Sequence, residues 1–394
     1  MNRFSEIEKK YVCEVIDNEF STSKNSIFGN RLESEFSKVI GMKFSIGHVN
    51  GTATMHTALA ALGIGMDDEV IVPPLTMSST ALAVLQNNSI PVFADVDKNT
   101  FNICSKSIKE KITVKTKAII TVALYGLSPD YDAILEICRT NNIYLIEDNA
   151  ESFLSYYKGK VVGSFGDFSS FSFQASKHLT CGEGGMLCVN NEELADKARK
   201  FSSLGYAGVS AKQGKITRND IQDPNYSRHV SLGFNYRLSE GNAAIVLGQL
   251  ERANELIDQR IQVANILNKG IEDSKIAICQ VEPEGYINSY WAFSWYLNTE
   301  NPGVDWYKFR DIFQKNGGDG FYAAWKLSYF EPLFLNIIQN MKGVTQKYEN
   351  GLCPVAEYLQ PRMVQMKTNY WNLEEAKCQA EILNKSLKEF EKNI

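Results

Sequence analysis

The feature that most constrains the fold is a regular alternation of short apolar runs with helical segments between residues 70 and 201. Runs of about four to eight residues bounded by helical patterns indicate βαβ units, which build a mostly parallel sheet. We therefore predict an α/β fold. The predicted strands cover residues 70–73, 91–96, 117–124, 143–148, 167–173 and 186–189, and the predicted helices cover residues 11–20, 32–40, 54–62, 79–86, 131–139 and 192–201.

The second half of the chain predicts a smaller lobe. Apolar residues recur at helical spacing from residue 243 to about residue 272, which predicts one long helix that bridges two lobes. We place a large domain at residues 1–250 and a small C-terminal domain at residues 251–394. The small domain is expected to contain a strand at 290–297 and helices at 306–315 and 373–390.

Composition excludes several classes of partner. The chain has 394 residues, 44% of them hydrophobic, and a net charge of −5 without a run of like charges, so we expect neither nucleic acid nor membrane as a partner. No apolar run approaches the ~20 residues that span a bilayer, and the first twenty residues lack a signal-peptide core. Eight cysteines without a CxxC pair, and four histidines without zinc-ligand spacing, predict free thiols, no metal site and a cytoplasmic protein.

The segment from Phe171 to Gly185 contains the first candidate for chemistry. Lys177 lies in a loop of small residues between two predicted strands, followed by a Gly-Glu-Gly-Gly run at 182–185. Such a loop fixes the backbone and leaves the amine free to reach a pocket, where it can form a Schiff base. The glycines indicate close backbone approach or positive φ. Taken alone, Lys177 is better explained as a solvated loop residue, and the partner motifs elsewhere in the chain reverse this interpretation.

Two further motifs lie at the ends of predicted elements. Gly51, Thr52 and Ala53 open a helical segment, and free amides, a hydroxyl and the helix dipole suit a phosphate. A plain helix cap by Thr52 is the alternative. Asp148 ends a predicted strand, at the carboxyl edge of the sheet where ligands bind, although such an aspartate can also cap a turn.

Together these motifs resemble those of the DegT/StrS sugar aminotransferases, pyridoxal-phosphate enzymes with the aspartate aminotransferase fold (fold type I). The matching residues are Ser172, Phe173, Lys177 and the glycine run at 182–185. The resemblance implies pyridoxal 5'-phosphate as cofactor, with Lys177 as the Schiff-base lysine. It also implies that Asp148 faces the pyridine nitrogen, because a protonated ring withdraws electrons from the substrate carbon. In a subgroup of this family, histidine replaces the Schiff-base lysine and the enzymes are dehydratases. In this chain Lys177 occupies the lysine position and His178 is the next residue, so the resemblance implies an aminotransferase.

The resemblance assigns further cofactor contacts. It implies that the turn at residues 51–53 and Ser172 bind the cofactor phosphate. It also implies that Glu151 lies near the phenolic oxygen of the cofactor, and that Met77 occupies the position where relatives stack an aromatic ring on the pyridine. Asn235 is implied to reach the cofactor phosphate of a second subunit, which would make the enzyme a homodimer with shared sites. The alternative is that Asn235 caps a turn before a helix that starts near Ser239.

Several features bear on the substrate. Met77, and Leu124 where relatives often carry histidine, could alter which substrate fits. The polar segment 205–229 is either a substrate lid or a surface loop. The aromatic-rich stretch 321–332 lies where relatives line the substrate site, although aromatic residues at such density also form cores. Gln174 and His178 are expected to be structural or substrate-facing.

The resemblance implies an aminotransferase that moves an amino group from L-glutamate onto a keto-sugar, with a nucleotide-linked sugar favoured and polysaccharide biosynthesis as the setting. One alternative acceptor is a keto or aldehyde sugar without a nucleotide, or a small phosphorylated carbonyl compound. Another alternative is a non-catalytic regulator of the same fold, against which the intact set of Lys177, Asp148 and Ser172 argues. The sequence does not identify the sugar, the ring carbon or the nucleotide.

Overall fold

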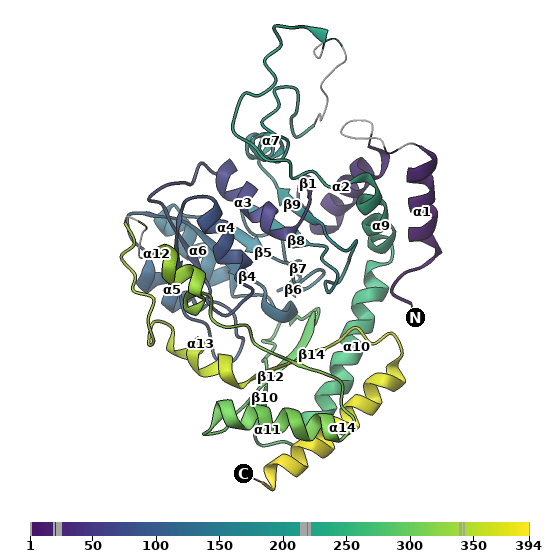
Figure 1. Cartoon of the computed structure of the whole chain (residues 1–394), viewed down its shortest axis with the longest axis vertical. Helices are drawn as coiled ribbons and strands as arrows, with labels where there is room; N and C mark the ends of the chain where they lie inside the picture. The colour runs from purple at the N-terminus through teal and green to yellow at the C-terminus, as the bar shows by residue number, and fades with distance from the viewer. Residues whose placement is uncertain are drawn as a thin grey trace.

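A computed structural model of the chain describes residues 2–18, 20, 26–212, 219, 222–338, 341 and 343–393 (Figure 1). Its centre is a seven-stranded sheet in the order β1-β9-β8-β5-β4-β2-β3. Strands β8, β5, β4, β2 and β3 run parallel, whereas β9 is antiparallel to both of its neighbours, β1 and β8. The strands are β1 Phe44–His48, β2 Glu69–Val72, β3 Ile90–Phe93, β4 Thr116–Val122, β5 Tyr144–Asp148, β8 Phe168–Ser172 and β9 Gly185–Val189.

Helices cover both faces of this sheet, which explains why its strands are nearly continuous apolar runs. Val70 and Val72 of β2 pack in one core cluster and Ile71 between them in another, because successive side chains point to opposite faces. The first cluster includes residues of α3, α4 and α7, and the second includes residues of α5 and α6. These helices are α3 Gly51–Ala61, α4 Ser79–Gln86, α5 Ser105–Lys111, α6 Tyr131–Asn141 and α7 Glu192–Phe201.

Three helices pack beside β8 and β9 at one end of the sheet. They are α1 (Glu6–Asp17), α2 (Ile27–Ile40) and α9 (Glu240–Leu250), and their apolar faces share a core cluster with Phe171 and Met186. Helix α1 begins earlier than the predicted residue 11, because Ser5 and Glu8 form a capping box at its start.

The predicted uninterrupted helix from residue 243 to 272 is wrong. Helix α9 ends at Leu250 and α10 (Ala253–Ile271) starts anew, because Arg252 leaves the helical region with φ −117° and ψ 15°. The Arg252 side chain turns instead to the N-terminal segment, where it donates to the Glu8 carboxylate at 3.2 Å and to the Asn2 carbonyl at 3.0 Å.

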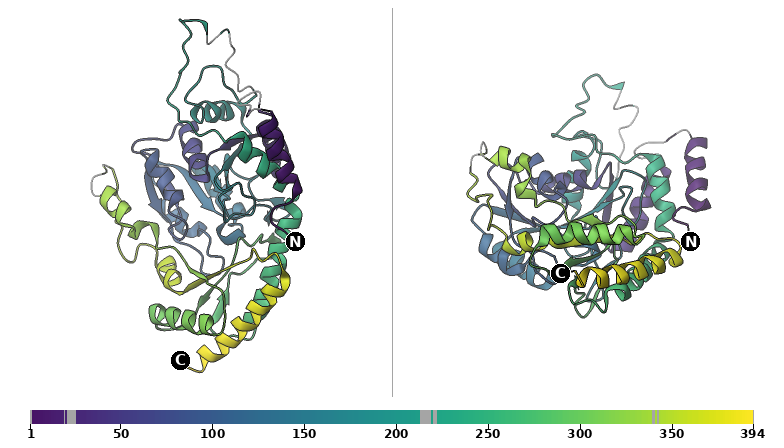
Figure 2. Two further views of the ribbon diagram at one scale, coloured as in Figure 1. Left: turned by 45° about the vertical axis from the view of Figure 1, so that its right-hand side comes forward. Right: turned by 60° about the horizontal axis from the view of Figure 1, so that its bottom comes forward.

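The C-terminal part forms a smaller α/β unit. Its antiparallel sheet has the order β10-β12-β14-β13, and Trp295 of β12 lies fully buried in the core cluster that joins this sheet to its helices. Figure 2 shows α10, α11 and α14 together at the end of the molecule remote from α7. The bounds are β10 Ala277–Cys279, β12 Ala292–Leu297, β13 Tyr322–Ala323, β14 Met363–Lys367, α11 Pro302–Lys315 and α14 Leu373–Glu391. The division between two domains at residue 250 stays a prediction.

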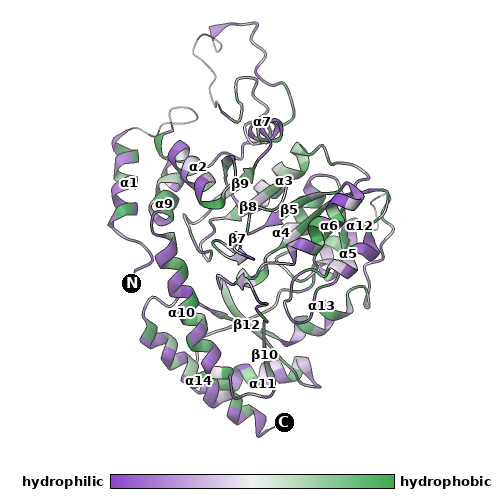
Figure 3. Ribbon diagram, turned by 180° about the vertical axis from the view of Figure 1, so that it is seen from behind, coloured by the Kyte–Doolittle hydropathy of each residue, from purple (hydrophilic) through white to green (hydrophobic). Residues whose placement is uncertain are grey.

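Short elements complete the described chain. Strands β11 (Tyr286–Ile287), β6 (Tyr156–Tyr157) and β7 (Lys160–Val161) form a small sheet, and α12 (Pro332–Ile338) and α13 (Pro354–Leu359) precede β14. Figure 3 shows that long helices such as α10 and α14 carry both hydrophobic and hydrophilic residues along their length. Among the described residues, no helix combines the length and the apolar character needed to cross a lipid bilayer.

Candidate active site

A cavity of about 330 Å³ lies at the carboxyl ends of β4, β5 and β8. We call it the lysine cavity. Seven of the predicted site residues line it: Gly51, Thr52, Met77, Asp148, Glu151, Ser172 and Lys177. The remaining lining residues are Asn50, Met55, Thr76, Ser79, Val122, Ala150, Gln174, Ser176, Glu183, Trp291 and Trp325. Ligands of open α/β sheets bind at this edge, so the topology gives these side chains a common place to meet.

Lys177 reaches this cavity from the loop of residues 173–184 between β8 and β9, which we call the lysine loop. Its amide donates to the Gln174 carbonyl at 2.9 Å, which closes a tight turn just before the lysine. Its Nζ lies 3.1 Å from Oε1 of Glu151 and 4.3 Å from the centre of the Trp291 ring. The amine is thus held between a carboxylate and an aromatic face, with 13% of its side chain exposed.

Asp148 faces the same cavity from the end of β5, with 4% of its surface exposed. Its Oδ2 accepts from the Thr80 hydroxyl at 2.8 Å, and its Oδ1 accepts from the Ala150 amide at 3.2 Å. Burial raises the pKa of the Asp148 carboxyl, while these two donors and the charge of Lys177 work against that rise. The structure therefore holds a desolvated carboxylate across the cavity from an amine.

The start of α3 forms a third side of the cavity. Asn50, not Thr52, caps this helix, because the Asn50 Oδ1 accepts from the Ala53 amide at 2.8 Å. The interpretation of Thr52 as the cap is therefore wrong. The Ala53 amide is bonded to this cap and Ala53 is not among the residues that line the cavity, so its phosphate contact stays a prediction. The amides of Gly51 and Thr52 belong to the first helical turn, where the helix itself supplies no acceptor.

Two glycines allow α3 to approach the sheet this closely. A Cβ added at Gly185 would lie 2.6 Å from the carbonyl carbon of Asn50, and one added at Gly51 would lie 3.0 Å from the Cβ of Ser172. A larger residue at position 185 would push the helix start away from β9. Gly185, the last residue of the Gly-Glu-Gly-Gly run, therefore has a steric role, because its lack of a side chain lets the start of α3 lie against β9.

Two tryptophans are among the residues that line the lysine cavity. The rings of Trp291 and Trp325 stack with centroids 6.0 Å apart and an interplanar angle of 21°. Met77 lies beside them at the cavity with 49% of its surface exposed. Trp325 comes from the aromatic-rich stretch singled out in the sequence, whereas no sequence signal identified Trp291. Its indole N–H donates to the Ser176 carbonyl at 3.1 Å, which ties it to the lysine loop.

Glu151 and His178 have different surroundings although both are buried. Glu151 accepts from the Tyr125 amide at 3.1 Å with its other oxygen, so its carboxylate is fixed between that amide and Lys177. His178 points away from the cavity and its Nε2 lies 3.0 Å from the Ser289 carbonyl oxygen. Burial lowers the pKa of His178 well below its ordinary range, so the ring is neutral. These contacts give His178 a structural role.

Asn235 does not line the lysine cavity of its own chain. It is exposed and forms an isolated bridge with Ser203, in the segment that follows α7 and extends away from the sheet at the top of Figure 1. Ser239 caps α9 by accepting from the Asn242 amide at 3.3 Å, so this helix starts where the sequence predicted. Part of the predicted 205–229 lid, residues 213–218, 220 and 221, lies outside the described residues.

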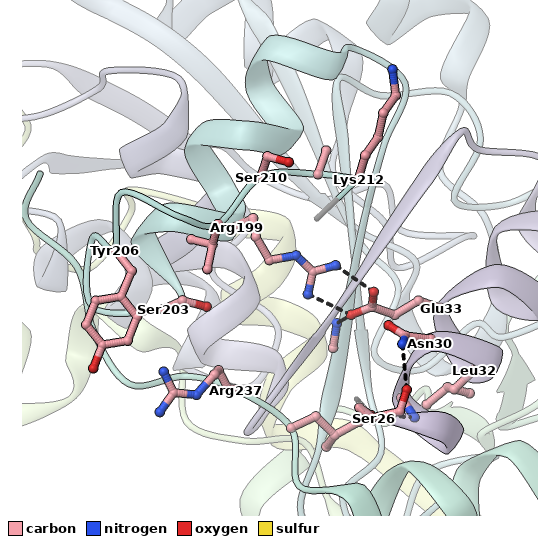
Figure 4. Close-up of a pocket in the computed structure, with 15 residues that line it drawn as sticks. Ser26, Asn30, Leu32, Glu33, Arg199, Ser203, Tyr206, Ser210, Lys212 and Arg237 are labelled. Atoms are coloured by element: carbon pink, nitrogen blue, oxygen red, sulfur yellow. Dashed lines mark hydrogen bonds and ion pairs between the residues drawn. The ribbon is translucent and has the colours of Figure 1, made fainter. Parts of the chain in front are cut away.

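A second cavity of about 130 Å³ lies between α2, α7 and the segment that follows α7 (Figure 4). We call it the arginine cavity. Arg199 donates to both carboxylate oxygens of Glu33, at 2.8 and 2.5 Å, and the Gly47 amide donates to Oε1 of Glu33 at 2.8 Å. Arg237 lines the same cavity from the segment that precedes α9.

The lysine cavity fits pyridoxal phosphate by the chemistry of its donors. It combines an amine for an aldehyde, a buried carboxylate for a pyridinium, and first-turn amides with the Ser172 hydroxyl for a phosphate. These groups come from different sides of one cavity large enough to enclose a single heterocycle.

Comparison with known proteins gives a consistent set of similarities. Residues 3–380 match the model of the DegT/DnrJ/EryC1/StrS aminotransferase family. The chain is 37% identical over 287 residues to a GDP-perosamine synthase of Escherichia coli O157:H7, covering 73% of this chain and 74% of that protein. It is 35% identical over 248 residues to a putative L-glutamine:3-amino-2,3-dideoxy-scyllo-inosose aminotransferase of Micromonospora echinospora, covering 62% and 56%.

Solved structures agree with the architecture. The crystal structure of an aminotransferase from Psychrobacter cryohalolentis superposes with a TM-score of 0.86 at 28% identity, over 98% of each chain. The predicted fold class, a fold type I α/β architecture with a mostly parallel central sheet, is therefore confirmed.

Proposed function

Because this chain belongs to the DegT/DnrJ/EryC1/StrS aminotransferase family, we propose that it moves an amino group from L-glutamate onto a nucleotide-linked keto-sugar in the lysine cavity. The resemblance recognised in the sequence is confirmed, and so are aminotransferase activity and dependence on pyridoxal 5'-phosphate as properties of the family. The donor, the acceptor and the roles of single residues belong to the proposal.

One observation carries the proposal. Lys177 Nζ and the Asp148 carboxylate line one cavity from neighbouring strand ends, with the first turn of α3 beside them. When bound there, pyridoxal phosphate supplies an electron sink for a carbanion at the substrate carbon. Asp148 holds the proton on the ring nitrogen. Lys177 moves a proton to and from the substrate carbon as general acid and base.

The other cavity residues bind and orient. The Gly51 and Thr52 amides with the Ser172 hydroxyl bind the phosphate group, as expected for a helix N-terminus. Glu151 keeps the free amine of Lys177 pointed into the cavity through its 3.1 Å contact. Met77 and the stacked rings of Trp291 and Trp325 exclude water from the lysine cavity.

The acceptor is inferred from relatives. The relatives named GDP-perosamine synthase, 37% and 33% identical, favour a sugar carried by a nucleotide. A 38% identical relative from Bacillus subtilis, named as a spore coat polysaccharide biosynthesis protein, favours a polysaccharide pathway. A free cyclitol ketone is the second candidate, because of the 35% identical relative whose name specifies a scyllo-inosose aminotransferase. That name also makes L-glutamine an amino donor to test beside L-glutamate.

Absorption spectroscopy tests the donor half of the reaction. The protein loaded with pyridoxal phosphate is expected to lose its yellow colour on addition of the correct donor, and borohydride trapping followed by peptide mapping should label Lys177. A label at another lysine, or a spectrum that neither donor changes, would contradict the proposal. Thermal stabilisation by nucleotides separates the two acceptors, because a ligand that binds only the folded state raises the melting temperature.

We propose that the active enzyme is a homodimer in which Asn235 reaches the cofactor phosphate of the partner. Its exposed position, away from the lysine cavity of its own chain, supports this arrangement. Mixing the inactive variants Lys177→Ala and Asn235→Ala tests it, because a shared site restores one intact lysine cavity in each mixed dimer. Activity that stays at the level of Asn235→Ala after mixing would show that the sites are not shared.

We place the reaction in the cytoplasm. All eight cysteines are free thiols, and none forms a disulfide. Free thiols of this number are typical of a reducing compartment. Fractionation of cells that express the chain tests this location.

A further inference from the structure

Two arginines from distant parts of the chain bind the backbone of the lysine loop. Arg3 donates from Nη1 to the Ala175 carbonyl and from Nη2 to the Lys177 carbonyl, both at 2.7 Å. Arg260 donates from Nη2 to the carbonyls of Ser176 and Lys177, both at 3.3 Å. Three consecutive carbonyls, including that of the candidate catalytic lysine, are thus bound by guanidinium groups.

Arg260 lies inside α10 with 1% of its surface exposed. Its Nη1 donates to the Trp291 carbonyl at 3.1 Å and to the Thr368 hydroxyl at 3.0 Å. Trp291 is the residue whose ring lies against the Lys177 amine. Arg260 therefore contacts both the loop that carries the lysine and the aromatic residue that packs on it.

The guanidinium groups of Arg3 and Arg260 bind backbone carbonyls rather than carboxylates. Within the described residues, neither has a carboxylate within 4.0 Å. Burial, with the charge of Arg3 adding to it, lowers the pKa of Arg260 to about 9. Burying Arg260 beside the half-buried Arg3 without a counter-ion is costly, so the carbonyl oxygens of the lysine loop must supply much of the compensating interaction.

The position of Arg3 depends on the docking of the N-terminal segment. Arg252 donates to the Asn2 carbonyl at 3.0 Å and to Glu8 at 3.2 Å, and α1 packs on α9. The residues before α1 are thereby fixed on the side of the molecule where the lysine loop lies. Arg3 can then reach carbonyls more than 170 residues away in the sequence.

We propose that Arg3 and Arg260 are positioning residues of the active site, which fix the backbone of the lysine loop so that the Lys177 amine stays between Glu151 and Trp291. The planar guanidinium of Arg3 holds two carbonyls from two separate nitrogen atoms in a fixed fork, a geometry that the single ammonium nitrogen of a lysine does not provide. The inference rests on the proposed function, because it assigns the catalytic amine to Lys177. It adds that the N-terminal segment is part of the active site.

Arg3→Ala is the main test, because Arg3 precedes the first helix and its loss leaves the core intact. We expect kcat to fall on the order of ten-fold, since misplacing a catalytic group by about 1 Å can cost up to a hundred-fold. The KM values and the melting temperature should change little. In the cofactor-free protein, hydrogen exchange of residues 174–178 should become faster. Arg3→Lys should give intermediate values, because it keeps the charge and one donor nitrogen but loses the planar fork.

Arg31→Ala is the matched control. Arg31 packs over the rings of Tyr11 and Phe28 and pairs with Glu251 at 3.5 Å, so it also helps to dock α1 but does not touch the lysine loop. We expect wild-type kcat and wild-type exchange at 174–178 for this variant. If Arg31→Ala reproduces the effects of Arg3→Ala, docking of α1 explains them and the proposal is overturned.

The outcomes separate this proposal from the proposed function. If Arg3→Ala has wild-type kcat and wild-type exchange, the positioning role is wrong while the aminotransferase assignment stands. If the wild-type protein does not transaminate, the function fails, and hydrogen exchange in the cofactor-free variants still decides whether Arg3 fixes the loop. Arg260→Lys should show the same exchange change as Arg3→Ala; if it does not fold, the Arg3 series decides alone.

Discussion

The lysine cavity and the arginine cavity both contain carboxylates and a cation, but they satisfy these charges differently. In the arginine cavity, Arg199 donates to both oxygens of Glu33, and the Gly47 amide adds a third bond. In the lysine cavity, Lys177 pairs with Glu151 at 3.1 Å, whereas Asp148 receives hydrogen bonds from neutral donors, the Thr80 hydroxyl and the Ala150 amide. A carboxylate neutralised by its partner holds a scaffold together, whereas one kept facing open space with a perturbed pKa is typical of a reaction site.

The largest expected effect comes from Lys177→Ala. Loss of the amine removes the group that transfers the proton, so kcat should fall roughly 10³-fold or more. The measurement is steady-state transamination with each donor, alongside circular dichroism to establish that the variant folds. Substantial residual activity in a folded variant would mean that the lysine cavity does not perform the chemistry.

Asp148→Asn should have the next largest effect. An amide cannot hold a proton on a pyridine nitrogen by charge, so kcat should fall on the order of 10²-fold, as when one electrostatic contact to a reacting centre is lost. Asp95→Asn is the matched control. Asp95 lies just after β3 and accepts from the Val355 and Ala356 amides at 2.9 Å, outside the cavity. If both variants lose kcat equally, the special role of Asp148 is not supported.

Arg199→Met tests whether the ion pair in the arginine cavity is structural. It leaves the partly buried Glu33 without its cation, so the free energy of unfolding should fall by about 2 kcal/mol. The kcat of the folded variant should stay within about two-fold of wild type, a change too small to indicate a catalytic contact. Urea unfolding and steady-state kinetics measure the two effects. A large fall in kcat would show that the arginine cavity belongs to the active site.

The smallest expected effect is the contribution of Asp148 to the pH dependence of the free energy of unfolding. Burial raises the pKa of Asp148 in the folded protein, so its favourable contribution is present at low pH and is lost as pH rises through that pKa. Asp148→Asn should therefore stabilise the cofactor-free protein at pH 7, and this gain should shrink on acidification toward pH 4. Urea unfolding at several pH values measures it. Destabilisation at pH 7 would mean that the Thr80 and Ala150 bonds outweigh the cost of burial.

Local patterns in the sequence predicted much of the fold and of the lysine cavity. Helices α4 and α7 have the bounds that helical periodicity predicted, and the parallel strands follow the apolar runs. Lys177 and Asp148 were recognised because each lies in a short motif next to a strand. Periodicity and motifs are properties of neighbouring residues, so the sequence expresses them directly.

The tertiary structure decided what joins these motifs. No local pattern predicted that β1 pairs with β9, that Trp291 packs on Lys177, or that Arg3 and Arg260 bind the lysine loop. The sequence also left open which of two neighbouring residues caps α3, and the structure shows that Asn50 rather than Thr52 does so. The sequence by itself determined which residues could do chemistry, and the packing of distant segments decided which of them meet. The physical reason is that such contacts depend on how whole helices and strands bury their apolar faces, which neighbouring residues do not encode.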